Sequence, residues 1–208
     1  MTRCLGLAIK RFIDFSIAAI GLLALSPVLA LLSVINAFVH GWPPFFVQPR
    51  PGKGERVFHM AKLRSMTNER GPDGELLPDA DRLTRFGQFL RKTSLDELPG
   101  LWSVLRGDMS LIGPRPLLVD YLPLYSKTQN RRHEMRPGIT GLAQVSGRNA
   151  QTWSERLHYD VTYVDDWSLM LDAKILWKTV RVVLGQEGVS ADGDATMPRF
   201  QGAPDFVG

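Results

Sequence analysis

The sequence predicts a helix-rich α+β protein that is attached to a membrane through its N-terminal helix. Three observations support this fold class: an apolar stretch from Phe12 to Val39, helical spacing of apolar residues farther along the chain, and one short run with strand-like alternation. The chain has 208 residues, 44% of them hydrophobic and 22% charged, which fits one ordered domain. We therefore expect residues 1–208 to form a single unit.

Charge and cysteine content limit the classes of partner and site. A net charge of +4 permits nucleic acid, an anionic membrane surface or phosphorylated substrates as partners, and does not choose among them. Cys4 is the only cysteine, which excludes an intramolecular disulfide and a cysteine-based zinc site. The four histidines do not have metal-ligand spacing. We therefore expect a reducing compartment and no histidine metal site.

The stretch from Phe12 to Val39 is long and apolar enough for a membrane segment, and Asp14 is its only charge. A secretory signal peptide has a shorter apolar core followed by a small-residue cleavage site, and neither feature is present here. We therefore expect residues 12–39 to remain in the mature protein as a membrane helix.

Positive charges on both sides of this helix predict its topology. The positive-inside rule favours a cytoplasmic location for both ends of the helix, whereas a helix that crosses the membrane once has only one end there. Two full crossings need about 20 apolar residues each, which is more than this stretch holds. The sequence therefore favours a re-entrant helix that enters and leaves by the same face. The flanking basic residues are Arg3, Lys10, Arg11, Arg50, Lys53 and Arg56.

Ser26 and Pro27 lie near the middle of the apolar stretch and predict a kink. Proline cannot donate a backbone hydrogen bond, and its ring crowds the carbonyl of Leu23. The Ser26 hydroxyl can satisfy a freed carbonyl, which lowers the cost in lipid. The alternative is an ordinary spanning helix with a tolerated proline, and these residues alone leave it open.

The segments after the membrane helix alternate between loops and short regular elements. Residues 43–58 are rich in proline and glycine and predict a turn-rich connection, followed by a strand near Val57 to Leu63. Asn68 to Arg82 is polar and predicts a surface loop. Arg85 to Leu105 has helical spacing that is broken by Pro99.

Two segments, Ser110 to Leu118 and Arg136 to Asn149, combine glycine, proline and arginine. Loops of this composition present backbone N–H groups and guanidinium groups, which suit phosphate. The alternative for either segment taken alone is a tight turn with solvated arginines.

Asp172 to Leu184 has a helical pattern with a basic stripe of Lys174, Lys178 and Arg181 beside an apolar face. This pattern is typical of a helix in the membrane interface, and also of any helix on a protein surface. The membrane anchor favours the first interpretation. Residues 185–208 have no apolar periodicity and predict a loosely ordered tail.

Asp96 and Glu97 are adjacent carboxylates that follow Arg91 and Lys92. Ser94 and Glu97 have capping-box spacing, so one interpretation is that Glu97 only caps a helix, although Pro99 disturbs the first turn. The other interpretation is chemical, because an ionised carboxylate can bind a hard cation such as magnesium or attack an electrophilic phosphorus.

In combination, these segments closely resemble the bacterial sugar transferase family, and more narrowly its small monotopic polyprenol-phosphate phosphoglycosyl transferases. The resemblance covers roughly Lys10 to Leu184. Its motifs are Lys10-Arg11 with Asp14, the helix broken at Ser26-Pro27, and the segments FVQPRPGKGERVFHMAKLRSM, LTRFGQFLRKTSLDELPGLWSVLRGDMSLIGPRPLL, RRHEMRPGITGLAQVSGRN and YDVTYVDDWSLMLDAKIL.

The resemblance implies a reaction in which Asp96 attacks the sugar-bearing phosphate of a UDP-sugar, expels UMP and passes the phosphosugar to undecaprenyl phosphate. Glu97 matches the second acid of the family's dyad, and Mg²⁺ bound by Asp96 is the expected cofactor. Arg91 and Arg115 are the first choices for phosphate contacts, because a planar guanidinium binds two phosphate oxygens at once. Arg136 and Arg148 are weaker choices.

The resemblance also implies a location and a set of partners. We expect a monotopic protein of the bacterial inner membrane, with a re-entrant helix over residues 12–39 and the active site on the cytoplasmic face. The catalytic domain, residues 40–184, is expected to carry interfacial helices and a small sheet. Expected partners are the UDP-sugar, undecaprenyl phosphate and the lipid bilayer, together with a second copy of the chain or downstream glycosyltransferases.

Two other classes compete with this interpretation. A non-catalytic re-entrant adaptor with a basic face would also bind anionic lipid, but it has no need for Asp96, Glu97 and the arginine-rich loops together. A nucleic-acid binder is disfavoured because basic residues are interleaved with acidic ones and no binding motif accompanies them.

Overall fold

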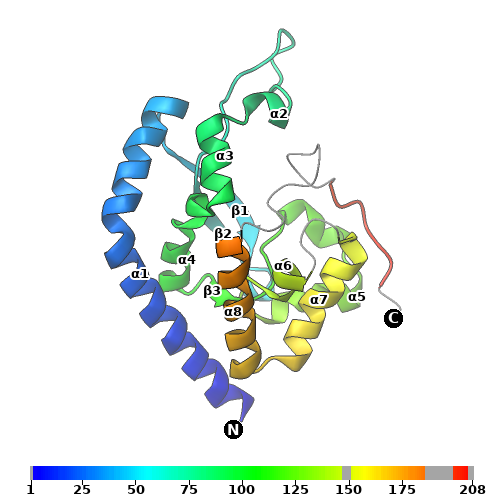
Figure 1. Ribbon diagram of the computed structural model, residues 1–208. Coiled ribbons are helices and arrows are strands. Elements are labelled where there is room, and N and C mark those ends of the chain that lie inside the picture. Colours follow the sequence, from blue (N-terminus) through cyan, green and yellow to red (C-terminus); the bar gives the residue numbers. More distant parts are fainter. Residues whose placement is uncertain (1, 147–150, 186–198, 206–208) are drawn as a thin grey trace.

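The computed structural model describes residues 2–146, 151–185 and 199–205. Its longest element is helix α1, Arg3–His40, and Figure 1 shows that α1 bends along one side of the domain with its concave side toward α4, Gly100–Arg106. The part of the chain that the structure describes is helix-rich with small sheets, so the predicted α+β class is confirmed.

Helix α1 is long and apolar enough to cross a membrane, and only 11% of its most apolar 18-residue window is buried in the protein. Pro27 lies inside the helix, and the Ser26 hydroxyl donates to the carbonyl of Leu23 at 2.9 Å. Leu23 is the residue whose carbonyl loses its usual i+4 donor to the proline. The predicted role of Ser26 is therefore confirmed.

The first half of α1 packs against the domain through polar contacts. Arg3 Nη2 donates to the carbonyl of Val164 at 2.7 Å, and Lys10 Nζ lies 2.8 Å from Asp172 Oδ2. Arg11 donates to the last carbonyls of α4, a favourable place for a cation. These contacts explain why the helix begins at Arg3, nine residues before the predicted start.

The second half of α1 returns to the same domain. Leu32 packs with Leu63 and Leu90 in a small apolar cluster, and Asn36 Nδ2 donates to the carbonyl of Arg64 at 2.9 Å. Both ends of the apolar helix therefore contact one folded unit, while most side chains in its middle point away from it.

Strands β1, Phe45–Pro51, and β2, Val57–Leu63, form an antiparallel pair joined by a turn with the 3-10 helix η1, Lys53–Glu55. The predicted strand near Val57 to Leu63 is confirmed. Phe58 and Met60 point from β2 into the main apolar cluster, where they meet Ala18 of α1 together with Val104 and Met109. The hairpin is therefore fixed on top of α1 and α4.

The region after β2 forms the upper part of the molecule in Figure 1, with the short helix α2, Asp79–Arg82, and helix α3, Arg85–Lys92. The predicted break in the helical pattern is observed: α3 ends at Lys92, a 3-10 turn η2 covers Leu95–Glu97, and α4 starts after Pro99.

Ser110 to Leu118 and Arg136 to Asn149 were expected to be loops only, but each contains a short strand. Strands β3, Ser110–Ile112, and β4, Gly138–Thr140, pair in parallel. A Cβ on Gly138 would lie 2.1 Å from the backbone nitrogen of Gly113, so glycine is required for this close approach. The motif holds two backbone segments together rather than forming open turns.

The remaining elements cover the far side of the domain. Tyr163 and Ile175 bring helices α7 and α8 together in a second apolar cluster. In chain order these elements are η3, Val119–Leu124; α5, Lys127–Asn130; η4, Arg131–Glu134; α6, Leu142–Ser146; α7, Trp153–Asp166; and α8, Leu169–Gly185. Helix α8 confirms the predicted helix, and its basic side chains Lys174, Lys178 and Arg181 are exposed.

The tail was predicted to be loosely ordered over residues 185–208, and this is wrong for residues 199–205. Phe200 is 2% exposed and packs with the rings of Tyr121, Tyr125 and Trp153. Gln129 Nε2 also donates to the carbonyl of Ala203 at 2.8 Å. One aromatic side chain and a few hydrogen bonds to other parts of the chain hold this segment, and such contacts leave no periodic pattern in the sequence.

Candidate active site

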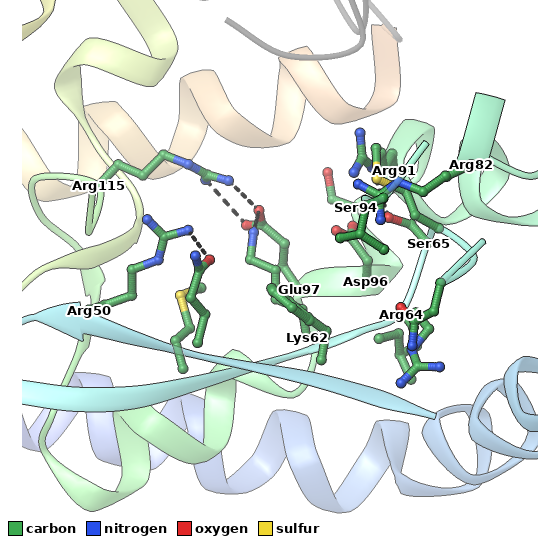
Figure 2. Close-up of a pocket in the computed structure, with 17 residues that line it drawn as sticks. Arg50, Lys62, Arg64, Ser65, Arg82, Arg91, Ser94, Asp96, Glu97 and Arg115 are labelled. Carbon is green, nitrogen blue, oxygen red and sulfur yellow. Dashed lines mark hydrogen bonds and ion pairs between the residues drawn. The ribbon is translucent and has the colours of Figure 1, made fainter. Parts of the chain in front are cut away.

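A cavity of about 630 Å³ lies between the β1–β2 hairpin and the segment that carries Asp96 and Glu97. Both carboxylates line it, and basic side chains surround them: Arg50, Lys62, Arg64, Arg82, Arg91 and Arg115. Figure 2 shows Arg50 and Arg115 on one side of the carboxylates, with Arg64, Arg82 and Arg91 on the opposite side. Such an excess of cations suits a ligand with more than one anionic group.

The backbone before the dyad determines where the two carboxylates point. Ser94 has a left-handed conformation with φ of 57°, which a residue with a side chain rarely adopts. Its side chain makes no capping hydrogen bond. The capping-box interpretation of Ser94 and Glu97 is therefore wrong, because the carboxylate of Glu97 turns toward β2 instead of toward the start of a helix.

Glu97 is held by two cations from different parts of the chain. Lys62 Nζ lies 2.7 Å from Glu97 Oε1, and Arg115 Nη2 lies 2.5 Å from the same oxygen. Burial alone would raise the pKa of Glu97, but the charges of Arg115 and Lys62 and their hydrogen bonds outweigh it and hold the pKa well below its usual range. Glu97 is therefore an ionised carboxylate that orients two cations at the cavity.

Asp96 has a different environment although it is the next residue. It is 8% exposed and lines the cavity. Burial, followed by the negative charge of Glu97, raises the pKa of Asp96 to about 6, against the opposing charges of Lys62, Arg115 and Arg91. Two adjacent carboxylates with separated pKa values are typical of a site with divided chemical roles.

The four arginines predicted to contact phosphate have different outcomes. Arg91 and Arg115 both line the cavity beside the dyad. Arg136 is not among the lining residues, and its Nε donates to the carbonyl of Gly107 at 2.9 Å, so it stabilises the end of α4. Arg148 lies outside the described residues.

Four lining cations were missed by the sequence analysis: Arg50, Lys62, Arg64 and Arg82. A signal for Lys62 was present, because alternation along β2 places it on the same face as Phe58 and Met60, which are buried. A lysine on the buried face of a predicted strand indicates a partner or a site. Arg82 lay within the predicted surface loop, and nothing in that composition marked it.

The described residues contain no group of three or more His, Cys, Asp or Glu side chains arranged to hold a metal ion. Asp96 is thus the cavity carboxylate that remains for a cation, since Glu97 is engaged by Lys62 and Arg115. One carboxylate together with substrate phosphate oxygens and water is a donor set that Mg²⁺ accepts.

The model of the bacterial sugar transferase family matches residues 5–186, which include the whole cavity. The chain belongs to the bacterial sugar transferase family. The resemblance inferred from the sequence is confirmed. Relatives named as undecaprenyl-phosphate sugar phosphotransferases support the polyprenol-phosphate type within the family.

Individual members of the bacterial sugar transferase family match over most of the chain. The uncharacterized sugar transferase EpsL of Bacillus subtilis (strain 168) is 51% identical over 198 residues, which is 95% of this chain and 98% of that protein. The UDP-glucose:undecaprenyl-phosphate glucose-1-phosphate transferase of Xanthomonas campestris pv. campestris is 41% identical over 189 residues. The undecaprenyl-phosphate galactose phosphotransferase of Salmonella typhimurium is 38% identical over 197 residues.

The family members differ in size. Each of the two named phosphotransferases matches 86% of this chain, but the matched part is 39% and 41% of their own lengths, respectively. The chain therefore spans about two fifths of these relatives and nearly all of EpsL. The matched part is the one that carries the dyad and the cationic cavity described above.

Proposed function

We propose that this protein transfers a sugar 1-phosphate from a UDP-sugar to undecaprenyl phosphate, through a covalent phosphosugar on Asp96, as a membrane step of polysaccharide or other glycoconjugate synthesis. The observation that carries this proposal is a buried aspartate at the centre of a cavity lined by six cations. The name of the Xanthomonas relative supports both the donor and the acceptor class, and the name of the Salmonella relative supports the acceptor class.

In the first step, a carboxylate oxygen of Asp96 attacks the phosphorus that bears the sugar. The bond between this phosphorus and the bridging oxygen of the diphosphate breaks, and UMP leaves with the bond's electron pair. In the second step, an oxygen of undecaprenyl phosphate attacks the phosphorus of the acyl phosphate. The Asp96 carboxylate is released, and the phosphosugar becomes part of a diphosphate-linked lipid.

The surrounding residues serve this displacement through charge and orientation. Negative charge accumulates on the phosphoryl oxygens and on the leaving phosphate, and fixed cations stabilise it without reorganising. Arg115 and Lys62 are preset by Glu97, while Arg91 approaches from the other side of Asp96. We assign these three cations to the donor diphosphate, and Glu97 to holding two of them in place.

Magnesium is the cofactor that this site would hold, with Asp96 as its protein ligand. When bound, it offsets the repulsion between the carboxylate and the diphosphate, two anions that must approach each other. The charge balance of the cavity is compatible with this assignment, because Glu97 is already neutralised by its own partners.

The placement of α1 supports a monotopic protein at the cytoplasmic face of the inner membrane. Lys10 and Asn36, near opposite ends of the helix, both contact the catalytic domain. A domain that stays on one side of the bilayer therefore keeps both helix ends on that side, and the basic residues around them favour the cytoplasm. Helix α8, with its exposed Lys174 and Trp177, is suited to the interface of the same leaflet.

The covalent step can be tested directly. Incubation with a panel of UDP-sugars and Mg²⁺ without lipid acceptor should release UMP, in an amount no greater than the enzyme, and leave a phosphosugar on the peptide that contains Asp96. Asp96→Asn, which keeps the shape but loses the anionic oxygen, should abolish both signals. A fully active enzyme that releases UMP only when undecaprenyl phosphate is present, with an unmodified Asp96 peptide, would replace the covalent mechanism by direct attack.

A further inference from the structure

The C-terminal end of α1 carries a polar side-chain cluster that the proposed chemistry does not use. Asn36 is fully buried and His40 is 8% exposed, and they follow each other at i, i+4 on the face of α1 that meets the domain. Asn36 Nδ2 donates to the carbonyl of Arg64 at 2.9 Å, and His40 Nε2 lies 2.8 Å from Thr84 Oγ1. Burying polar side chains on a membrane helix costs free energy, and residues that carry this cost usually have a function.

The backbone carbonyl of Arg64 fixes the direction of the first two hydrogen bonds in this cluster. The carbonyl of Arg64 can only accept, so the Asn36 amide donates there and turns Oδ1 toward His40 Nδ1. Oδ1 can only accept, so Nδ1 of His40 carries a proton. At the other end, the backbone N–H of Gly87 donates to Thr84 Oγ1 at 2.9 Å. The Thr84 hydroxyl still has its own proton to donate to His40 Nε2. Burial and the charge of Arg64 lower the pKa of His40, which favours this arrangement with a neutral imidazole.

This chain connects α1 to the start of α3, which leads to the active site. Thr84 is the N-cap of α3, and its side chain accepts from Gly87. A Cβ on Gly87 would lie 1.8 Å from the carbonyl oxygen of Ser65, so α3 packs directly on the backbone beside Arg64. One helical turn farther on, Arg91 Nε donates to Ser65 Oγ at 3.0 Å. The orientation of α3 therefore determines where Arg91 enters the cavity.

Arg64 is tied to the same point. Its Nη1 donates to the carbonyl of His40 at 3.1 Å, while its own carbonyl accepts from Asn36. Arg64 and Arg91 both line the cavity on the side of Asp96 that is opposite to Arg115. Two of the cations near Asp96 are thus held through contacts that lead back to the end of the membrane helix.

We propose that His40 is a positioning residue, a neutral imidazole with its proton on Nδ1 that joins the end of the membrane helix to the N-cap of α3 and thereby places Arg91 and Arg64 for the phosphates of the substrate. The inference rests on the proposed function for the identity of the ligand. The hydrogen-bond arrangement itself does not depend on that function. This arrangement gives α1 a second role besides membrane attachment, because the position and angle of α1 then affect where Arg64 and Arg91 lie in the cavity.

The first test reads the tautomer without reference to activity. Protein labelled with 15N-histidine in lipid nanodiscs should show, at neutral pH, a neutral imidazole with the proton on Nδ1 that disappears from the spectrum of His40→Gln. The signal of His133, whose Nδ1 also donates to oxygens of Asn130, should remain. An imidazolium, or a neutral ring with the proton on Nε2, would overturn the proposed chain.

The second test measures binding of UDP, which carries the diphosphate of the donor. His40→Phe keeps a ring of similar size but strands the polar atoms of Asn36 and Thr84, so UDP should bind about tenfold more weakly, with KM for the UDP-sugar affected more than kcat. His40→Gln can donate to Asn36 and accept from Thr84, and should bind UDP within about twofold of wild type. The control His59→Phe changes an exposed histidine outside the cavity and should bind UDP normally.

The outcomes separate the two proposals. Normal UDP binding by folded His40→Phe, or equal damage in His40→Gln, would overturn the positioning role. If His40→Phe does not fold, Thr84→Val removes the same hydrogen bond at the other partner, and normal UDP binding by that variant would also overturn it. A wild-type protein that binds no UDP would count against the proposed function, while the tautomer measurement still decides how His40 is bonded.

Discussion

Arg115 donates two hydrogen bonds to the carboxylate of Glu97, at 2.5 Å to Oε1 and 3.4 Å to Oε2. This bidentate contact, together with Lys62, lowers the pKa of Glu97 although the residue is buried, while the neighbouring Asp96 has a raised pKa. The pair thus divides into a permanently ionised residue that orients cations and a residue whose charge depends on pH. The first two predictions follow from this difference.

The first prediction concerns the pH dependence of the wild-type enzyme. Because the pKa of Asp96 is about 6 and only the ionised carboxylate attacks, the ionised fraction falls as pH decreases through that value. We expect kcat/KM for the UDP-sugar to be constant at neutral pH and to fall about tenfold per pH unit below 6. The measurement is initial UMP release between pH 5 and about 8, a range that covers both sides of this pKa. A profile that stays flat to pH 5 would contradict the assignment.

The second prediction separates Glu97 from Asp96. Glu97→Gln removes a negative charge that raises the pKa of Asp96 and frees Lys62 and Arg115 to interact with Asp96 instead. The acid limb of the pH profile should therefore move to lower pH, while turnover at neutral pH falls by about tenfold or more because the cations are misplaced. Glu134→Gln, at an exposed carboxylate paired with Arg131, is the matched control and should change neither quantity. An unchanged acid limb in Glu97→Gln would show that the two carboxylates do not interact.

The third prediction is a gain in stability that accompanies loss of activity. The pKa of Asp96 is raised from 3.8 to about 6, so the folded state takes up a proton more readily than the unfolded state, and the ionised side chain costs stability above this range. Asp96→Asn should raise the free energy of unfolding by about 1–3 kcal/mol at pH 7.5. Near pH 5, where the folded state holds Asp96 mostly protonated but the unfolded side chain is still ionised, about half of the difference should remain, because it is lost only as the pH falls from 6 to below 3.8. Thermal unfolding at the two pH values measures this, and an Asp96→Asn variant that is less stable at pH 7.5 would contradict it.

The fourth prediction compares Arg91, which lines the cavity, with Arg136, which does not. Arg91→Ala removes a cation from the cavity and should raise KM for the UDP-sugar by about 10- to 100-fold. Arg136→Ala removes a hydrogen bond to the carbonyl of Gly107, so it should lower stability by about 1 kcal/mol and leave KM unchanged. Steady-state kinetics with thermal unfolding of both variants checks this. A large rise of KM in Arg136→Ala would return that residue to the substrate site.

The fifth prediction concerns topology. Leu5, in the first turn of α1, and Lys53, beyond its C-terminal end, are exposed residues on either side of the apolar stretch. The exposed Cys4 can be replaced by serine beforehand. Cysteines introduced at the two positions should both react with an impermeant maleimide in inverted inner-membrane vesicles and in neither case from the periplasm. Reaction of one position from the periplasm would indicate a helix that spans the bilayer.

Helices and strands could be predicted where their periodic residue pattern lies within one continuous segment of the sequence. Strand β2 was found because its alternation is complete within seven residues, and α8 because its apolar and basic residues follow one helical period. Strands β3 and β4 were missed because each has three residues and exists only through pairing with the other, which joins Ser110 to Gly138. Such contacts depend on tertiary structure and leave no pattern in either segment.

The candidate site was predicted in part. Asp96, Glu97, Arg91 and Arg115 were assigned because their segments in combination resemble a known family, whereas each segment alone also allowed a purely structural interpretation. Lys62 lies on β2, whose alternating apolar residues indicate which face is buried but not which residues have a function. Lys62 contacts Glu97 only because β2 lies across η2. The left-handed backbone conformation of Ser94 could not be predicted, because serine rarely adopts it. The capping box proposed for Ser94 and Glu97 was therefore wrong.

The polar contacts of α1 constrain how the protein is made. Lys10 pairs with Asp172, which lies 162 residues later, so the helix leaves the ribosome long before its partner. At about 5–20 residues per second, the interval is on the order of 8–30 s. During this time Lys10 can pair only with neighbours on its own helix, such as Asp14 at 3.7 Å. The buried contact between the start of α1 and the catalytic domain forms only after α8 has been synthesised. Docking of the first half of α1 is therefore a late step of folding, although α1 is made first.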